Sequence, residues 1–144
     1  MIDHLTLTVR DVPRSIAFYT RALAPLGYGV SMRFENFVGM GTPKKPFFWL
    51  KAGPVPTTPM HLAFTAPSRE AVDRFHAEAL AAGAQDDGPP GLRPHYHPHY
   101  YGAFVLDVDG HPIEAVCHTP AVSKPARKKA PPKRAPKSAA KKRR

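Results

Sequence analysis

Apolar and polar side chains alternate over two stretches of the chain that closely repeat each other. In residues 3–9 the apolar positions are Leu5, Leu7 and Val9, and the positions between them are polar. Such alternation predicts a strand with one buried face. A shift of 57 positions brings residues 60–66 onto the same pattern. The repeat indicates two copies of one supersecondary unit.

A helical pattern follows each of these strands. Apolar residues recur at helical spacing after Asp11, a favourable N-cap, and Gly27 is a suitable residue to end the helix. The second copy repeats this arrangement between Ser68, another N-cap candidate, and Gly83. Each strand is therefore expected to lead into one amphipathic helix that covers its apolar face.

Short runs of β-forming residues, separated by glycine and proline, follow each helix. The weakest of these strand patterns lies at residues 85–93, and an Asp-Gly turn at residues 107–110 is typical of a hairpin. The expected strands after the helices are 28–34, 37–40 and 47–50 in the first copy, and 85–93, 103–106 and 113–117 in the second.

These patterns predict an α+β fold of two tandem β-α-β-β-β modules, with a curved mixed sheet around a central cavity. We expect the first module at residues 1–52 and the second at residues 60–120. The proline-rich residues 53–59 between them read as a semi-rigid linker.

The remaining residues, 121–144, form a tail that carries all of the excess positive charge. They hold eleven Lys or Arg and no acid, whereas residues 1–120 hold ten Lys or Arg and eleven Asp or Glu. A segment with so few apolar residues is expected to be disordered. It suits weak, nonspecific contact with nucleic acid, for which the folded part would be a scaffold, and it equally suits a solubilising extension. The basic residues expected to make such contacts include Lys128, Lys129, Lys133, Arg134, Lys141 and Lys142.

Cysteine content and hydropathy bear on the compartment. The single cysteine, Cys117, excludes an internal disulfide and favours a cytoplasmic setting, and its apolar neighbours predict a buried thiol. No apolar run approaches the ~18 residues that a membrane span needs. The N-terminal sequence also shows no pattern of a secretory signal.

Two histidines occupy equivalent places in the repeat. Alternation places His4 on the strand face opposite Leu5, and His61 takes the same position in the second copy. Glu114 points away from its apolar neighbours in the last expected strand. If all three side chains face one cavity, they form a set that suits Fe(II), Mn(II), Ni(II), Co(II) or Zn(II). The alternative is that duplication copied a polar residue with no role in chemistry.

Histidines and tyrosines concentrate in residues 93–101, just before the last hairpin. This segment is either a lid whose side chains move a proton at the site or a polar surface loop with aromatic anchors. The catalytic candidates in it are His97, Tyr100 and Tyr101. Outside this segment, His76 is expected on a helix surface, and His111 is expected to be exposed beside the Asp-Gly turn.

Two segments closely resemble a known superfamily. The opening, Ile2 to Asp11 followed by Ser15 to Tyr19, and the closing hairpin, Tyr100 to Val116, are similar to the vicinal oxygen chelate superfamily. This superfamily includes glyoxalases, bleomycin-resistance proteins and extradiol dioxygenases. The resemblance covers roughly residues 1–118, and it implies paired β-α-β-β-β modules around a divalent metal ion. The ligands that it implies are His4, His61 and Glu114.

The chain departs from the glyoxalase I pattern at one position. Those enzymes carry a fourth ligand, a glutamate, on the last strand of the first module, and residues 47–50 contain no carboxylate. The difference favours the three-ligand arrangement of dioxygenases and thiol transferases. Phe48 and Trp49 instead suggest an apolar wall for a substrate, and Arg33 is a candidate for a charged substrate group.

The resemblance therefore implies a metal-dependent enzyme that binds a small substrate through vicinal oxygens. It would stabilise an enediolate or activate dioxygen, and the missing glutamate favours oxidoreductase chemistry of the dioxygenase type over a lactoylglutathione lyase. The alternative is a metal-free protein that sequesters a drug or metabolite, as bleomycin-resistance proteins do. The resemblance also implies a homodimer whose site lies within one chain or between two.

Overall fold

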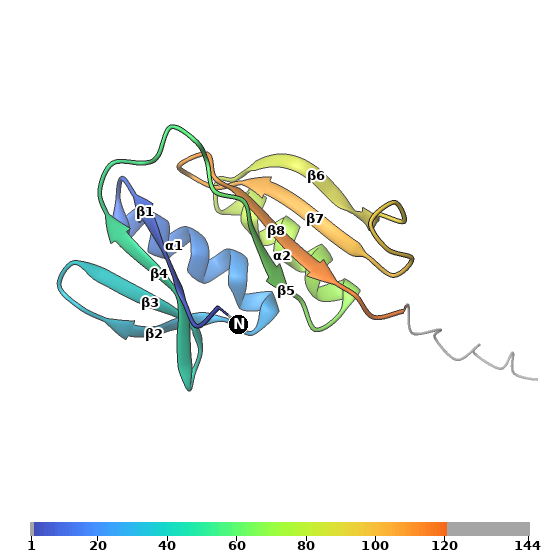
Figure 1. The fold of residues 1–144 in the computed structure, drawn as a ribbon, viewed down its shortest axis with the longest axis horizontal. Coiled ribbons are helices and arrows are strands. Elements are labelled where there is room, and N and C mark those ends of the chain that lie inside the picture. The colour runs from blue at the N-terminus through green and yellow to red at the C-terminus, as the bar shows by residue number, and fades with distance from the viewer. Residues whose placement is uncertain (1, 121–144) are drawn as a thin grey trace, which may run out of the picture.

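Each half of the chain folds as a strand, a helix and three further strands (Figure 1). The computed structural model describes residues 2–120, so the predicted disorder and nucleic-acid contacts of the tail lie outside the described residues. The first module comprises β1 (Leu5–Val9), α1 (Val12–Leu23), the 3₁₀ helix η1 (Ala24–Leu26), β2 (Gly29–Arg33), β3 (Phe37–Thr42) and β4 (Lys45–Ala52). The second comprises β5 (Leu62–Thr65), α2 (Arg69–Ala81), β6 (Gln85–Leu92), β7 (Tyr101–Leu106) and β8 (Pro112–Cys117).

The predicted pair of tandem modules is confirmed, with one four-stranded mixed sheet in each. The strand orders are β1-β4-β3-β2 and β5-β8-β7-β6. In both sheets the first strand runs parallel to the last, and the other neighbours are antiparallel. Thr6 pairs with Trp49 in the first sheet, and Ala63 pairs with Glu114 in the second. Trp49 and Glu114 therefore occupy equivalent positions of the two modules.

Local sequence signals account for the ends of the helices. The side chain of Asp11 accepts a hydrogen bond from the backbone N–H of Arg14 at 2.9 Å, and Ser68 caps α2 in the same way. Gly27 takes a left-handed conformation with φ of 83° after η1, which a residue with a Cβ rarely adopts. None of the helices in residues 2–120 is long and apolar enough to cross a bilayer.

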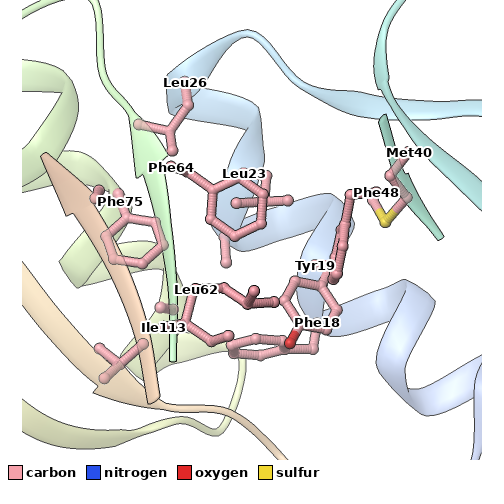
Figure 2. Packing of buried hydrophobic residues seen from close by; sticks show 14 of the residues in the cluster. Phe18, Tyr19, Leu23, Leu26, Met40, Phe48, Leu62, Phe64, Phe75 and Ile113 are labelled. Atoms are coloured by element: carbon pink, nitrogen blue, oxygen red, sulfur yellow. The ribbon is translucent and has the colours of Figure 1, made fainter. Parts of the chain in front are cut away.

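The two modules share one hydrophobic core (Figure 2). Phe64 of β5 packs edge-on against Phe48 of β4, with ring centroids 5.4 Å apart, and α1 packs against α2. Phe48 also contacts Tyr19 and is fully buried. This position corrects the expectation that Phe48 lines a substrate pocket, because alternation along β4 turns it toward α1. Cys117 is buried, as predicted.

The turn between β7 and β8 is held by a buried carboxylate, Asp107. It accepts hydrogen bonds from the Tyr19 hydroxyl at 2.5 Å and from the backbone N–H groups of Asp109 and His111, both at 2.8 Å. The prediction that His111 is exposed is wrong. Its ring is fully buried, and its Nδ1 accepts a hydrogen bond from the Met60 backbone N–H at 3.4 Å. The segment that enters the second module therefore covers this histidine.

His76 is also less exposed than its place on the second helix suggests. Its side chain is 12% exposed, and Nε2 lies 2.9 Å from Asp86 Oδ1. The hydrogen bond to His76 is the main cause that lowers the pKa of Asp86. This pair joins α2 to β6, so His76 has a structural role at the edge of the second module.

Candidate functional site

A buried glutamate is the centre of the candidate site in the second module. Glu114 of β8 is 3% exposed, and both of its carboxylate oxygens have partners. His61 Nε2 lies 3.0 Å from Oε2, and the Tyr100 hydroxyl donates a short hydrogen bond to Oε1. The imidazole of His61 is 53% exposed, so one side of this pair is open to a ligand.

Strand register explains why these side chains meet. Glu114 lies beside Ala63 on β5, and His61 is two residues before Ala63 in the chain, so both point to the same side of the sheet. Gly102 on β7 leaves the space that the Tyr100–Glu114 pair fills. A Cβ at Gly102 would lie 3.1 Å from Glu114 Oε1 and 3.2 Å from Tyr100 Cε1.

Tyr100 is a proton donor in this arrangement. Desolvation is the main cause that raises the pKa of its hydroxyl, and the hydrogen bond to Glu114 raises it further. The hydroxyl therefore keeps its proton at neutral pH and fixes one oxygen of the carboxylate. The other partners of Tyr100 are ring contacts with Tyr96 and His118.

The other two catalytic candidates lie farther from Glu114. Tyr101 is on the opposite side of β7 and donates a hydrogen bond to Asp73 of α2 at 2.7 Å. Desolvation and this bond raise the pKa of Tyr101 to about 12. His97 lies near His118, with ring centroids 5.3 Å apart and the rings tilted. The structure therefore brings Tyr100 to the glutamate, but not Tyr101, and it places His97 at the edge of the cluster.

His4 has a different environment in the first module. Its Nδ1 lies 2.9 Å from Asp3 Oδ1, and the other oxygen of Asp3 accepts a hydrogen bond from Lys45 Nζ at 2.5 Å. The hydrogen bonds from His4 and then Lys45 lower the pKa of Asp3 to about 2. Because the ionised carboxylate holds the proton on Nδ1, the lone pair of neutral His4 lies on Nε2.

A cavity of about 530 Å³ opens beside His4. All of its lining residues belong to the first module, and they include Asp3, His4, Thr6, Lys45 and Trp49. Trp49 lines this cavity. The candidate Arg33 instead lines a separate cavity of about 520 Å³ beside the N-terminal end of α1.

The three predicted ligands are therefore divided between two places. His61 and Glu114 are in direct contact, whereas His4 is bound to Asp3. Within residues 2–120 of one chain, no group of three His, Cys, Asp or Glu side chains is placed to hold a metal ion. Sequence reasoning did not find Asp3 or Lys45, because their pairing depends on a contact between residues 42 positions apart.

Comparisons with a family model and with solved structures indicate the same protein family. The family model described as Glyoxalase/Bleomycin resistance protein/Dioxygenase superfamily matches residues 1–115. A solved glyoxalase/bleomycin resistance protein from Albidiferax ferrireducens is 29% identical with a TM-score of 0.70, and the match covers 81% of this chain and 98% of that chain. No curated protein sequence matches.

Two further solved structures share the fold. A glyoxalase/bleomycin resistance protein/dioxygenase family enzyme from Burkholderia phytofirmans is 23% identical, with a TM-score of 0.65 and coverage of 82% of this chain and 98% of that chain. TioX from a Micromonospora species is 17% identical, with a TM-score of 0.63 and coverage of 83% and 99%.

Proposed function

The chain belongs to the Glyoxalase/Bleomycin resistance protein/Dioxygenase superfamily, and from this premise we propose that it is an enzyme that uses a divalent metal ion to act on a small molecule. The observation that carries the proposal is the contact of 3.0 Å between His61 Nε2 and Glu114 Oε2 at an open face of the second sheet. Together with His4, these side chains would hold the ion.

The donor atoms of this site fit such an ion. Two imidazole nitrogens and one carboxylate suit Fe(II), Mn(II), Ni(II), Co(II) or Zn(II) and leave coordination positions for a substrate. Asp3 keeps the proton of His4 on Nδ1, so Nε2 is free to bind. When bound, the ion would act as a Lewis acid on the oxygen atoms of the substrate.

The protein's own residues have separable roles in this proposal. Tyr100 and the surrounding apolar groups hold Glu114 in one position, and Asp3 holds the ring of His4. Trp49 forms a wall that orients a substrate and excludes water. Because Trp49 occupies the position equivalent to Glu114, the first module has no fourth carboxylate there. This supports chemistry of the three-ligand, dioxygenase-like type over a lactoylglutathione lyase.

We place the complete site between two copies of the chain. The described residues of one chain gather only two of the three ligands, His61 and Glu114. A second copy would supply His4 from its first module, and a symmetric homodimer would then contain two equal sites.

Elemental analysis of purified protein tests the proposal directly. The wild-type protein is expected to hold about one divalent ion per chain, and His61→Ala is expected to hold almost none, because a ligand is lost. His95→Ala is a matched control, since His95 is an exposed histidine outside the proposed ligand set. Equal metal content in His61→Ala and His95→Ala would contradict the proposal.

The second candidate function is a metal-free binding protein. It is favoured by one observation: both oxygens of Glu114 have partners within the protein, His61 and Tyr100. In that case the wild-type protein would hold no metal after incubation with any of the five ions and removal of the excess. Binding of a small molecule would then be unchanged by a chelator.

Replacement of Tyr100 by phenylalanine tests the proposed positioning of the glutamate. Tyr100→Phe removes the donor to Glu114 Oε1, and metal affinity is expected to fall about 10- to 100-fold, as for other groups that orient a ligand. Tyr96→Phe is the control, because Tyr96 is 61% exposed and makes no hydrogen bond with Glu114. A metal titration that gives the same affinity for both variants would exclude this role.

A further inference from the structure

The cavity beside His4 contains an aromatic surface with a defined position. Gly39 of β3 pairs with Trp49 of β4, and the six-membered ring of the indole occupies the space beside this glycine. A Cβ at Gly39 would lie 2.7 Å from Trp49 Cζ3 and 2.9 Å from Pro46 Cβ, too close for either to stay in place. The absence of a side chain at Gly39 therefore allows the indole to form one wall of the cavity.

A second aromatic ring, Phe37, also lines this cavity, and Phe34 of the neighbouring cavity packs against it. Phe37 packs edge-on against Trp49 with ring centroids 5.7 Å apart, and Phe34 packs against Phe37 at 4.9 Å. Phe37 is 39% exposed and Phe34 is 52% exposed. Large aromatic side chains left open around a cavity indicate a surface for an apolar ligand.

The two lysines that line the cavity differ in whether an acidic residue neutralises their charge. Lys45 is paired with Asp3 at 2.5 Å. Lys51 lies on the same face of β4 as Trp49, and its ammonium group makes no hydrogen bond or ion pair with any other described residue. A ligand that contacts the indole therefore meets one uncompensated positive charge.

We propose that this cavity binds a small aromatic carboxylate, with its ring against Trp49 and its carboxylate toward Lys51. The inference rests on the proposed function in one respect: it takes this ligand to be the substrate of the metal site. A volume of about 530 Å³ lies within the range of small-molecule sites. The ring would gain aromatic contact with Trp49, and the lysine would select an acid over an alcohol.

Trp49 is the one tryptophan of the chain, so its fluorescence reports on this wall alone. We would titrate the full-length, metal-free protein with benzoate, with cyclohexanecarboxylate and with benzyl alcohol. Benzoate is expected to change the emission saturably and to bind about tenfold more tightly than either analogue. Equal affinity for benzoate and cyclohexanecarboxylate, or for benzoate and benzyl alcohol, would overturn the inference.

Two pairs of variants separate ring recognition from charge recognition. Lys51→Gln is expected to weaken benzoate binding about tenfold, and Lys44→Gln, which changes an exposed lysine outside the cavity, is expected to leave it unchanged. Gly39→Ala would displace the indole and weaken benzoate binding, whereas Gly29→Ala places a Cβ with no atom within 4 Å. If Gly39→Ala does not fold, Lys51→Gln still decides the question. Wild-type benzoate affinity in Lys51→Gln would contradict the proposal.

Elemental analysis of the same proteins before the metal is removed keeps the two proposals distinct. Selective benzoate binding by a protein that takes up no metal would support this inference and contradict the proposed enzyme. Stoichiometric metal without any preference for an aromatic acid would contradict this inference alone.

Discussion

A mixture of two metal-free variants, His4→Ala and His61→Ala, is expected to recover metal binding when the chains are co-expressed. If His4 of one copy completes the His61–Glu114 pair of the other, each mixed dimer contains one intact site and one site without either histidine. With random pairing, about one quarter of the wild-type metal content should return. Elemental analysis of the co-expressed protein, beside each variant expressed alone, measures this recovery.

The matched control is co-expression of His61→Ala with Glu114→Gln. Both substitutions lie in the same pair of contacting residues, so every site of a mixed dimer lacks one ligand and no metal should return. Recovery in the first mixture but not in the second requires two chains for each site. If neither mixture recovers metal while the wild-type protein binds it, the proposal that the site is shared between copies is wrong.

Regular elements could be predicted because their signals are local. The alternation in β1 and the N-caps Asp11 and Ser68 depend on a few neighbouring residues. The structure contains this strand and both caps, as expected. The strand with the weakest pattern, β6, also has the least regular pairing. Its register with β7 shifts on both sides of Gly88. A strand interrupted by Gly88 and by two prolines cannot show clean alternation.

For the candidate site, the sequence predicts which side chains share a face of a strand, and nothing more about their positions. Alternation places Glu114 and His61 on one face of a sheet, and the structure has them in contact. It also places Trp49 and Phe48 on opposite faces, but it does not say which face the helix covers. The aromatic character of residues 48 and 49 predicts both at the cavity, but Phe48 packs against Tyr19 in the core.

Contacts between distant segments explain the remaining differences. His111 follows a turn, where exposure is usual, but Met60 and the segment around it cover the ring. The pairing of Asp3 with Lys45 likewise depends on how β4 lies beside the N-terminal segment. Neither contact has a signal in the residues next to it in the chain. A contact between two chains likewise has no signal in neighbouring residues, and the mixing experiment tests it.

Substitution of Asp107 by alanine is expected to cause a large loss of stability, although Asp107 lies outside the proposed site. Asp107 is 6% exposed and accepts three hydrogen bonds, from the Tyr19 hydroxyl and from two backbone N–H groups of its own turn. Burial and the neighbouring Asp107 raise the pKa of Tyr19, so its hydroxyl remains a donor. Asp107→Ala leaves these donors without an acceptor, and the free energy of unfolding should fall by about 3 kcal/mol or more.

Urea unfolding followed by circular dichroism measures this loss, and Asp87→Ala is the control because Asp87 is an exposed acid. Tyr19→Phe separates the contributions. It removes one of the three donors and should reduce the free energy of unfolding by about 1–3 kcal/mol, since Asp107 keeps its two backbone partners. If Asp107→Ala unfolds at the same urea concentration as Asp87→Ala, the link between α1 and the β7–β8 turn does not stabilise the pairing of the modules. The two modules would then be held together by the shared apolar core and by other polar contacts, such as the ion pair of 2.6 Å between Arg21 and Glu78.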